Sequence, residues 1–571
     1  MILPDSLKNV LALFAEVFET WASEQLYTQF VTSHRHHLLV KLNERLDLSG
    51  MEAACGGYYH GSGPGKPVHH GVKRLVRAVL VRYLYGYSLR ETEQAINANL
   101  FIKWYVGYGV FERGPDHSTL EDFELWLLCK QKRLLFDEVL RQVDQTFPAE
   151  RTKAQVGDTY AMEANAAIEN LTPRLRHASQ QLLEAYRNSG LLDSQNVLSG
   201  YNWLALFGPP NEADEGFLEK CKRQARLQST VLAVLDLIQR IEGGLRGFSI
   251  QQHPEVRRWV ACLHKIIADE CRMEAQSVVE LPNKDKGDFR IISASDPEAS
   301  FRMHGEEAED ITLGYNVQVA ATVSGFVRET QAYTGAVPDQ VGVAALVAEQ
   351  VEHLGCCPPK LIYDMAGGHG KTRAEVEQAS RGKTQIVAKL PPYDVRTRFG
   401  PYDFTLSEDG ISLTCPNGKV STIAYNSQSG DGRDFRFFAC QCWQGEIPTQ
   451  WRKADLSKRC PLWEQCRDAR QGPGGMRQVF ISDYRQQVLD AQIHNQTQAF
   501  KQDMKLRPRI ERIIFELTHY NGARRCQRHG LAAADFQAKM ASTAYNLKLW
   551  MRKLDNPTRQ RRAWQVPAAA G

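Results

Sequence analysis

The chain has 571 residues, of which 43% are hydrophobic and 24% are charged. This length predicts two to four domains and excludes a single small module, and the near-average composition excludes a disordered regulator or a collagen-like fibre. Lysine and arginine number 70 against 66 aspartate and glutamate residues, so the net charge of +4 says little about partners.

The distribution of the charge is more informative, because two segments are strongly basic. Lys66–Arg90 contains six basic residues and no acid, and Lys501–Gly571 contains 15 basic residues and five acids. Basic surfaces on a nearly neutral chain favour a polyanionic partner, most often nucleic acid, and a solvated lysine-rich face is the alternative.

No segment approaches the ~20 continuous apolar residues of a membrane span. The first twenty residues carry Asp5, Lys8, Glu16 and Glu19 where a signal peptide would need an apolar core. We therefore expect a soluble protein of the cytoplasm.

The N-terminal part of the chain is predicted to be helical. Residues 1–45 have the pattern of an amphipathic helix, and Val72–Tyr85 places apolar residues at helical spacing with its arginines on the other side, up to a stop at Gly86. Ser88 stands three residues before Glu91, a capping-box pattern that begins a second helix through Asn97.

Ser118 stands in the same way before Glu121 and predicts a third helix. Three helices in this order suggest a helix-turn-helix-like DNA-binding unit at about 66–127, within a helical domain 1–147, although such units are also ordinary packing modules. If it binds DNA, we expect Lys73, Arg74 and Arg77 to contact phosphates. Arg90, Gln94 or Asn97 of the second helix would then contact bases.

The middle of the chain alternates between strand and helix. A short strand is predicted over Lys153–Tyr160, and strands resume later with a short helix at Thr372–Gln378. The later strands are Gly314–Thr322, Phe326–Ala332, Lys360–Asp364 and Gln385–Lys389, and the helices between are Pro173–Arg187, Phe217–Glu242 and Val256–Ala275. This order predicts an α/β fold interrupted by a helical insertion, with helix returning over Leu506–Trp550.

Five of the 13 cysteines lie close together, at Cys415, Cys440, Cys442, Cys460 and Cys466. In a reducing cytosol such a group suggests a metal before a disulfide, and four thiolates would cross-link a segment that has little apolar content of its own. We predict a structural Zn²⁺ bound by Cys415, Cys442, Cys460 and Cys466, with Cys440 left over. Reduced cysteines without a metal are the alternative.

Three carboxylates occupy positions next to predicted buried segments, where an acidic side chain is unusual. Asp158 lies within the predicted strand, Asp364 ends the apolar run Leu361–Tyr363, and Glu511 lies on the flank of a helix, four residues after Arg507. Together they could hold two Mg²⁺ ions for phosphodiester chemistry. Taken singly, each acid could instead be a helix cap or a surface ion-pair partner.

Several segments, in order, resemble the DDE transposases of bacterial insertion sequences. They are Tyr85–Glu91, Pro115–Leu120, Gly157–Asn165, Ser295–Ala299, Leu313–Gln318, Tyr363–Gly367, Arg509–Leu517 and Ala541–Lys548. The resemblance covers about residues 66–550.

This resemblance implies a ribonuclease H-like core in which Asp158, Asp364 and Glu511 form the catalytic triad, with Glu516 as a rival for the third place. It implies a transposase that binds the inverted ends of its element and catalyses Mg²⁺- or Mn²⁺-dependent strand cleavage and strand transfer, acting on double-stranded DNA as a homodimer or higher oligomer. The implied core is 148–170 and 286–410, with a helical insertion 171–285, a cysteine-rich insertion 411–485, core helices 486–550 and a basic tail 551–571.

The chain departs from the related pattern around the last acid. Arg507 can take the Arg place, but Met504 occupies the Tyr place and Thr518 the Lys place, so Arg524, Arg525 and Arg528 are candidates to contact DNA instead. Asp296 and Asp339 also lie in or near the shared segments, and we expect them to be structural caps. Two other functions stay open: a transposase-derived DNA-binding protein without catalysis, and a host nuclease selective for DNA structure.

Overall fold

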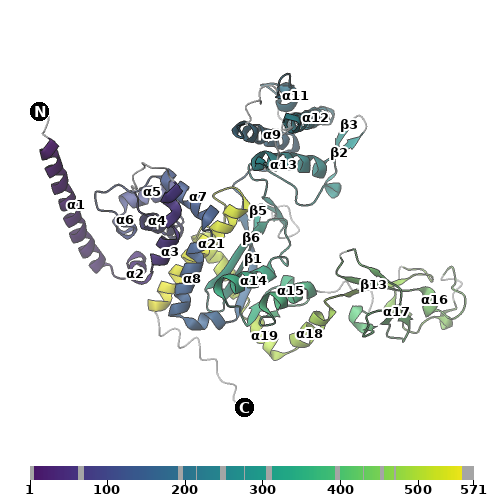
Figure 1. The fold of residues 1–571 in the computed structure, drawn as a ribbon. Coiled ribbons are helices and arrows are strands. Elements are labelled where there is room, and N and C mark those ends of the chain that lie inside the picture. Colours follow the sequence, from purple (N-terminus) through teal and green to yellow (C-terminus); the bar gives the residue numbers. More distant parts are fainter. Residues whose placement is uncertain are drawn as a thin grey trace, which may run out of the picture. The chain divides into compact units, whose positions relative to one another are not determined.

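The structure is a computed structural model. It describes residues 5–61, 70–190, 197–213, 215–244, 252–274, 277–303, 311–391, 399–428, 430–450, 455–468 and 471–555 (Figure 1). Lys66 and the basic tail beyond Asp555 therefore lie outside the described residues. The fold is mixed α/β and has two compact units: unit 1 is Met1–Glu150, Asp158–Asp339 and Ile510–Gly571, and unit 2 is Arg151–Gly157 and Gln340–Arg509. No helix among the described residues is both long and apolar enough to cross a membrane.

Unit 1 begins with a series of helices. They are α1 (Asp5–Ser33), α2 (Leu38–Arg45), α3 (Ser49–Ala54), α4 (Val72–Tyr85), α5 (Leu89–Ala98), α6 (Leu100–Val106), α7 (His117–Lys130) and α8 (Leu134–Thr146). The helix predicted over Val72–Tyr85 is confirmed, and Gly86 ends it with a φ of 71°, a conformation that glycine adopts without strain. The capping box of Ser88 and Glu91 is also confirmed. The single helix expected over 1–45 is instead two helices, α1 and α2.

The predicted start of the third helix at Ser118 is wrong. Helix α7 is capped by Asp116, whose carboxylate accepts a hydrogen bond of 2.7 Å from the backbone N–H of Thr119. Asp is as good an N-cap as Ser, so a capping pattern two residues earlier in the chain defines the helix start here.

The arginines of α4 do not all lie on its outer side, which corrects the sequence prediction. Arg82 is 4% exposed, and its guanidinium donates hydrogen bonds to Glu124 of α7 and to Gln527. A buried arginine is tolerated here because its partners satisfy the charge and most of the donors.

Unit 1 also contains an antiparallel sheet edge. Strand β5 (Ile311–Thr322) pairs with β4 (Ser300–Met303) through its first residues and with β6 (Val327–Thr334) through the rest. On its other side β5 is the neighbour of β1 (Gln155–Glu163), whose residues from Asp158 onward belong to this unit. The long helix α21 (Leu531–Asp555) contacts β6, α8 and α4 (Figure 1).

Charged pairs connect these elements inside the core. Arg328 of β6 is fully buried and binds both carboxylate oxygens of Asp144 of α8, at 2.5 and 3.0 Å. Glu329 of β6 binds Arg133 at 2.8 Å, and burial raises its pKa. The helical N-terminal region is thus joined to the sheet by buried charges as well as by apolar packing.

The segment after β1 forms a separate helical cluster within unit 1. Helices α9 (Leu171–Asn188), α11 (Trp203–Phe207), α12 (Lys220–Gly244) and α13 (Pro254–Glu270) share one apolar core, so helices are present where the sequence predicted them after the first strand. The sequence prediction missed a hairpin here, β2 (Cys271–Glu274) paired with β3 (Ser277–Glu280). The predicted helix Val256–Ala275 is therefore wrong in its last residues, and α13 ends at Glu270.

Unit 2 contains parallel strand pairs. Strand β7 (Lys360–Ile362) pairs with the first residues of β1 on one side and with β8 (Gln385–Val387) on the other. The helices of this unit are α14 (Val343–Leu354), α15 (Gly370–Ser380), α18 (Arg485–Asn495) and α19 (Gln498–Met504). Strand, helix and parallel strand is the predicted α/β pattern.

Two small antiparallel sheets complete unit 2. One consists of β9 (Thr405–Leu406), β10 (Leu413–Thr414) and β11 (Val420–Ser421), and the other of β12 (Ala424–Asn426), β13 (Gly432–Phe437) and β14 (Arg477–Ser482). Two short helices, α16 (Ala439–Cys442) and α17 (Trp463–Cys466), follow β13 and precede β14. The predicted helix over Leu506–Trp550 is interrupted: α20 (Arg509–Tyr520) ends before α21 begins at Leu531.

Candidate functional site

Asp158 is the fourth residue of β1 and is half-buried. One of its carboxylate oxygens, Oδ1, accepts a hydrogen bond of 2.9 Å from the backbone N–H of Thr159. The residues around it, Val156 and Tyr160, are buried. The prediction that Asp158 lies within a core strand is therefore confirmed.

Asp364 comes directly after β7 and is also half-buried. Its Oδ1 accepts a hydrogen bond of 2.9 Å from the backbone N–H of Ala366 and so caps the short turn Met365–Gly368. Gly367 and Gly368 are buried in this turn, and a β-carbon on Gly368 would lie 1.9 Å from the carbonyl oxygen of Lys389. These glycines are needed for close packing.

The register between the parallel strands β1 and β7 relates the positions of Asp158 and Asp364. Val156 of β1 pairs with Ile362 of β7. Asp158 is the second residue after Val156, and Asp364 is the second residue after Ile362. Each acid therefore stands the same number of residues beyond a registered pair.

The two candidate third acids differ in their surroundings. Glu516 of α20 is bound at both carboxylate oxygens, by Arg512 at 3.3 Å and by Arg552 at 3.2 Å. Glu511 is exposed on the first turn of α20, beside the buried Ile510. The ion pairs of Glu516 are those of a structural residue.

The Ser295–Ala299 segment has a role that the sequence did not specify. Asp296 is fully buried, and its carboxylate accepts hydrogen bonds from the hydroxyl of Tyr315 and from the backbone N–H of Gly530. Glu298 accepts a hydrogen bond of 2.7 Å from the backbone N–H of Leu531. Asp296 therefore binds the residue that precedes α21, and Glu298 binds the first residue of that helix, more than two hundred residues later in the chain. Asp339 instead accepts a hydrogen bond from Asn316 of β5.

The predicted phosphate-contacting residues of α4 already have partners within unit 1. Arg74 binds both carboxylate oxygens of Glu112, at 2.6 and 3.2 Å, and Arg77 donates to the carbonyl oxygen of Tyr105. Lys73 has a more open position, with 54% of its side chain exposed and Glu52 at 3.3 Å.

The candidate base-contacting residues of α5 also differ, since some are exposed and one is hydrogen-bonded within the protein. Arg90 and Gln94 are exposed. Asn97 uses both ends of its amide within the protein, since Nδ2 donates to the carbonyl oxygen of Glu93 and Oδ1 accepts from the N–H of Gly114. Arg90 and Gln94 are therefore the residues of α5 best placed to reach a base.

The arginines around α20 also differ from one another. Arg524 has 68% of its side chain exposed, and Arg525 is exposed beside Asn165. Arg528 instead bridges Glu121 at 2.9 Å and the buried Glu124 at 3.1 Å. Arg507 is half-buried. Exposure thus favours Arg524 and Arg525 as contacts for a large external partner.

Four of the five clustered cysteines line one small cavity in unit 2. The cavity has a volume of about 20 Å³, and its cysteines are Cys415, Cys442, Cys460 and Cys466. Phe399, Phe437, Leu462 and Trp463 form much of the remaining wall. Cys440 is exposed and is not part of the lining.

The cysteine sulfurs of this cavity accept hydrogen bonds from N–H groups. Cys415 Sγ accepts from the backbone N–H of Lys419 at 3.2 Å, Cys460 Sγ from the Asn417 amide at 3.2 Å, and Cys442 Sγ from the guanidinium of Arg467 at 3.4 Å. Burial raises the pKa of the Cys442 and Cys466 thiols. In the part of the chain that the structure describes, no group of three or more His, Cys, Asp or Glu side chains is placed so that it could hold a metal ion.

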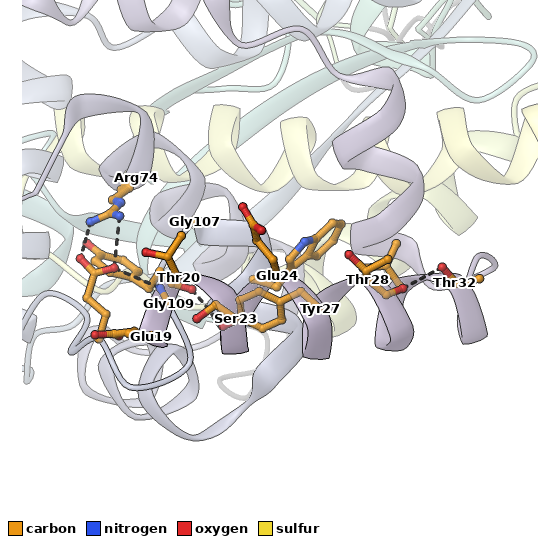
Figure 2. A pocket seen from close by; sticks show the side chains of 14 residues that line it. Glu19, Thr20, Ser23, Glu24, Tyr27, Thr28, Thr32, Arg74, Gly107 and Gly109 are labelled. Atoms are coloured by element: carbon orange, nitrogen blue, oxygen red, sulfur yellow. Dashed lines mark hydrogen bonds and ion pairs between the residues drawn. The ribbon is translucent and has the colours of Figure 1, made fainter. Parts of the chain in front are cut away.

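A much larger cavity, of about 830 Å³, lies between α1 and the helices that follow it. Figure 2 shows Glu19, Ser23 and Tyr27 of α1 along this cavity with Arg74 on its other side. Burial raises the pKa of Tyr27 to about 12, and Glu112 and Glu19 add to the rise. With Glu19, Glu24 and Glu112 in its wall, the cavity is unsuited to a phosphate group, and none of the candidate acids of the triad lines it.

Comparisons with known protein families give two matches. Residues 27–124 match a family described as a transposase domain (DUF772), and residues 414–550 match a family described as a transposase DDE domain. The first stretch contains Arg90 and Lys73, and the second contains Glu511 and the five clustered cysteines. No curated protein and no solved structure matches the chain.

Proposed function

Because this chain is a DDE transposase of an insertion sequence, we propose that it binds the inverted ends of its own element and catalyses cleavage and strand transfer of double-stranded DNA. The observation that carries the proposal is the presence of two transposase families in one chain, a transposase domain over residues 27–124 and a transposase DDE domain over residues 414–550. The protein would work in the bacterial cytoplasm, on the nucleoid.

The pairing of the strands supports a ribonuclease H-like core. In unit 1, β6 pairs with β5 and β5 is the neighbour of β1, and in unit 2, β1 pairs with β7 and β7 with β8. The sheet thus combines the antiparallel pair of β5 and β6 with the parallel strands β1, β7 and β8, and this mixed sheet supports the core that the resemblance implies. We propose β1, β5, β6, β7 and β8 as the strands of that core.

Asp158, Asp364 and Glu511 are the proposed catalytic acids. Val156 pairs with Ile362, and Asp158 and Asp364 each come two residues later. Equivalent positions of this kind suit two acids that share metal ions. Glu511 is proposed as the third acid because it stands four residues after Arg507, as in the family resemblance, and Glu516, which binds Arg512 and Arg552, is the rival.

Carboxylate oxygens are the donors that Mg²⁺ and Mn²⁺ prefer, so the donor set of the three acids fits two such ions. When bound, these ions would lower the pKa of an attacking water and neutralise charge on the phosphate. The three carboxylates would hold the metal ions beside the reacting phosphate, and the nucleophile would be first a water and then the 3′-hydroxyl of the cut strand. No covalent bond to the protein is needed, since each step exchanges one oxygen on phosphorus for another.

The exposed basic residues are the proposed DNA contacts. Lys73 and Arg524 would neutralise phosphates, and Arg90 and Gln94 would reach base edges from α5. Two element ends must be processed together, so we propose that the protein acts as a homodimer or higher oligomer on DNA. A structural zinc ion at the clustered cysteines would be separate from this chemistry.

The test is a nicking assay on DNA that ends in the terminal repeats of the element, with Mg²⁺ or with EDTA. We expect Mg²⁺-dependent cleavage at the repeat boundary, which Asp158→Asn and Asp364→Asn abolish while binding to the same DNA is kept. Binding without cleavage by the unaltered protein would favour a non-catalytic DNA-binding protein. Cleavage that follows DNA shape and ignores the terminal repeats would favour a structure-selective nuclease, and either outcome contradicts the proposal.

A further inference from the structure

The cysteine-rich part of unit 2 has too little secondary structure to hold its shape unaided. The strands of its first sheet, β9, β10 and β11, are two residues long each, and the helices α16 and α17 have four residues each. Its apolar clusters are small: one is centred on Phe404, Phe435 and Phe437, and the other on Trp443 and Trp463. Small modules of this kind are usually stabilised by a disulfide or a metal ion.

The four cysteines that line the small cavity come from different parts of this module. Cys415 follows β10, Cys442 ends α16, Cys460 precedes α17, and Cys466 ends α17. The backbones of two of them are already connected, since the N–H of Cys460 donates to the carbonyl oxygen of Cys442 at 2.8 Å. Ligands that are distant in sequence and close in space are typical of a structural metal site.

We propose that Cys415, Cys442, Cys460 and Cys466 bind one structural Zn²⁺ ion, which cross-links the two small sheets of unit 2. All four cysteines line one cavity of about 20 Å³, a volume large enough for a single ion. Four thiolates and no carboxylate or histidine form a closed, soft donor set of the kind that zinc takes in structural sites.

Three of the four sulfurs accept hydrogen bonds that zinc-bound thiolates can keep. The N–H donors from Lys419, Asn417 and Arg467 would offset part of the negative charge that four thiolates bring to one zinc ion. Cys415-Pro416-Asn417-Gly418 forms a tight turn, with Gly418 at a φ of 73° and its N–H bonded to the carbonyl oxygen of Cys415. Binding draws the four side chains inward from these positions, because no complete coordination set is present among the described residues beforehand.

Cys440 provides a matched control. It lies only two residues before Cys442 on the same short helix, but it is exposed and outside the cavity. A metal held by sequence-local or non-specific thiols would depend on Cys440 as much as on Cys442. A metal held in this cavity would depend on Cys442 alone.

The first test is metal analysis of the full-length protein purified without a chelator. We expect about one zinc ion per chain in the unaltered protein and in Cys440→Ser, and less than about a tenth of that in Cys442→Ser and Cys466→Ser. A folded protein without metal, an iron content in place of zinc, or an equal loss in Cys440→Ser would each overturn the proposal. The outcome does not depend on whether the protein cuts DNA.

The second test keeps the metal in place, in case the serine variants fail to fold. In the Co²⁺-substituted protein, four thiolates give intense visible bands of a tetrahedral site. Cys415→His should shift these bands to shorter wavelength, because a nitrogen ligand replaces a sulfur, while Cys440→His should leave them unchanged. If Cys415→His leaves the spectrum unchanged, Cys415 is not a ligand and the proposed site is wrong.

Discussion

Gly157 of β1 lies directly against the ring of Tyr363: a β-carbon built on Gly157 would stand 2.7 Å from two ring carbons, Cδ2 and Cε2. Gly157 immediately precedes Asp158, and Tyr363 immediately precedes Asp364. Tyr363 is fully buried, and its backbone N–H donates to the carbonyl oxygen of Val387 in β8. The packing of these two residues therefore fixes the backbone next to both proposed catalytic aspartates.

Gly157→Ala should reduce DNA cleavage without touching an acid. The added methyl group cannot fit against Tyr363, and overpacking of this kind costs about 1–3 kcal/mol of stability. A displacement of about 1 Å near a reacting group can lower the rate by about a hundredfold. Cleavage rate and thermal unfolding of the variant would be measured together.

Two further variants make this test specific. Gly157→Ala combined with Tyr363→Val should recover part of the cleavage, because the smaller side chain makes room. Gly56→Ala is the control, since a β-carbon there meets no atom within 4 Å. Unchanged cleavage by Gly157→Ala would show that the contact does not position the acids.

Glu511→Gln should lower cleavage by about a hundredfold or more, because an amide is a much poorer ligand for Mg²⁺ than a carboxylate. Glu516→Gln should leave cleavage within a few-fold, since its carboxylate binds Arg512 and Arg552. The measurement is single-turnover cleavage of DNA at saturating Mg²⁺. If Glu516→Gln lowers cleavage more than Glu511→Gln does, the third acid is Glu516.

Arg90→Ala should reduce the preference for the terminal repeat over random DNA by about 1–3 kcal/mol if the arginine contacts a base. Lys73→Ala should weaken binding to both DNAs and lower the salt slope by about one unit. Arg528→Ala should instead lower stability by about 1–3 kcal/mol with an unchanged salt slope, because it removes a partner of the buried Glu124. Binding titrations at several salt concentrations distinguish these three variants. A reduced salt slope for Arg528→Ala would show that Arg528 contacts DNA.

Arg328→Met should destabilise unit 1 by about 3–5 kcal/mol, because it leaves the buried carboxylate of Asp144 without its arginine. Combining it with Asp144→Leu should recover much of the loss, since the two buried charges are then removed together. Arg240→Ala is the control: its ion pair with Asp236 is half-exposed, and its loss should cost about 1 kcal/mol or less. Denaturant unfolding of these three variants and of the unaltered protein measures this, and an Arg328→Met variant as stable as the control would contradict it.

Lys548 should make the stability of the protein depend on alkaline pH. Burial, with a further contribution from Arg552, lowers the pKa of Lys548 from 10.5 to about 8 in the folded state. Between these two values the unfolded chain binds the proton and the folded chain does not, so stability should rise with pH from about 8 to 10.5. The measurement is the difference in unfolding free energy between the unaltered protein and Lys548→Met across this range.

Lys548→Arg is the control for this pH dependence, because its guanidinium keeps its proton throughout the range. The difference between the unaltered protein and Lys548→Met should be flat below pH 8 and should favour the unaltered protein increasingly above it. A flat difference over the whole range would show that Lys548 stays charged in the fold.

Local patterns in the sequence predicted the elements that depend on nearby residues. The spacing of apolar residues over Val72–Tyr85, the stop at Gly86 and the capping box of Ser88 and Glu91 all have their causes within one or two helical turns. The choice between Asp116 and Ser118 as a cap was missed because both residues satisfy the same local rule. The β2–β3 hairpin was missed because the residues of β2 also continue the helical pattern of α13.

Residue types at recognisable spacings were enough to predict the family, the candidate acids and the candidate cysteine ligands. They could not predict which basic residues are exposed. Arg82 and Arg528 bind Glu124, and Arg74 binds Glu112. Arg90 and Arg524 are instead exposed. Only the tertiary structure decided this, and it also decided that Cys442 and not its neighbour Cys440 lines the small cavity. The physical reason is that charge pairing and cavity lining depend on contacts between residues far apart in the chain, and such contacts leave no periodic pattern in the sequence.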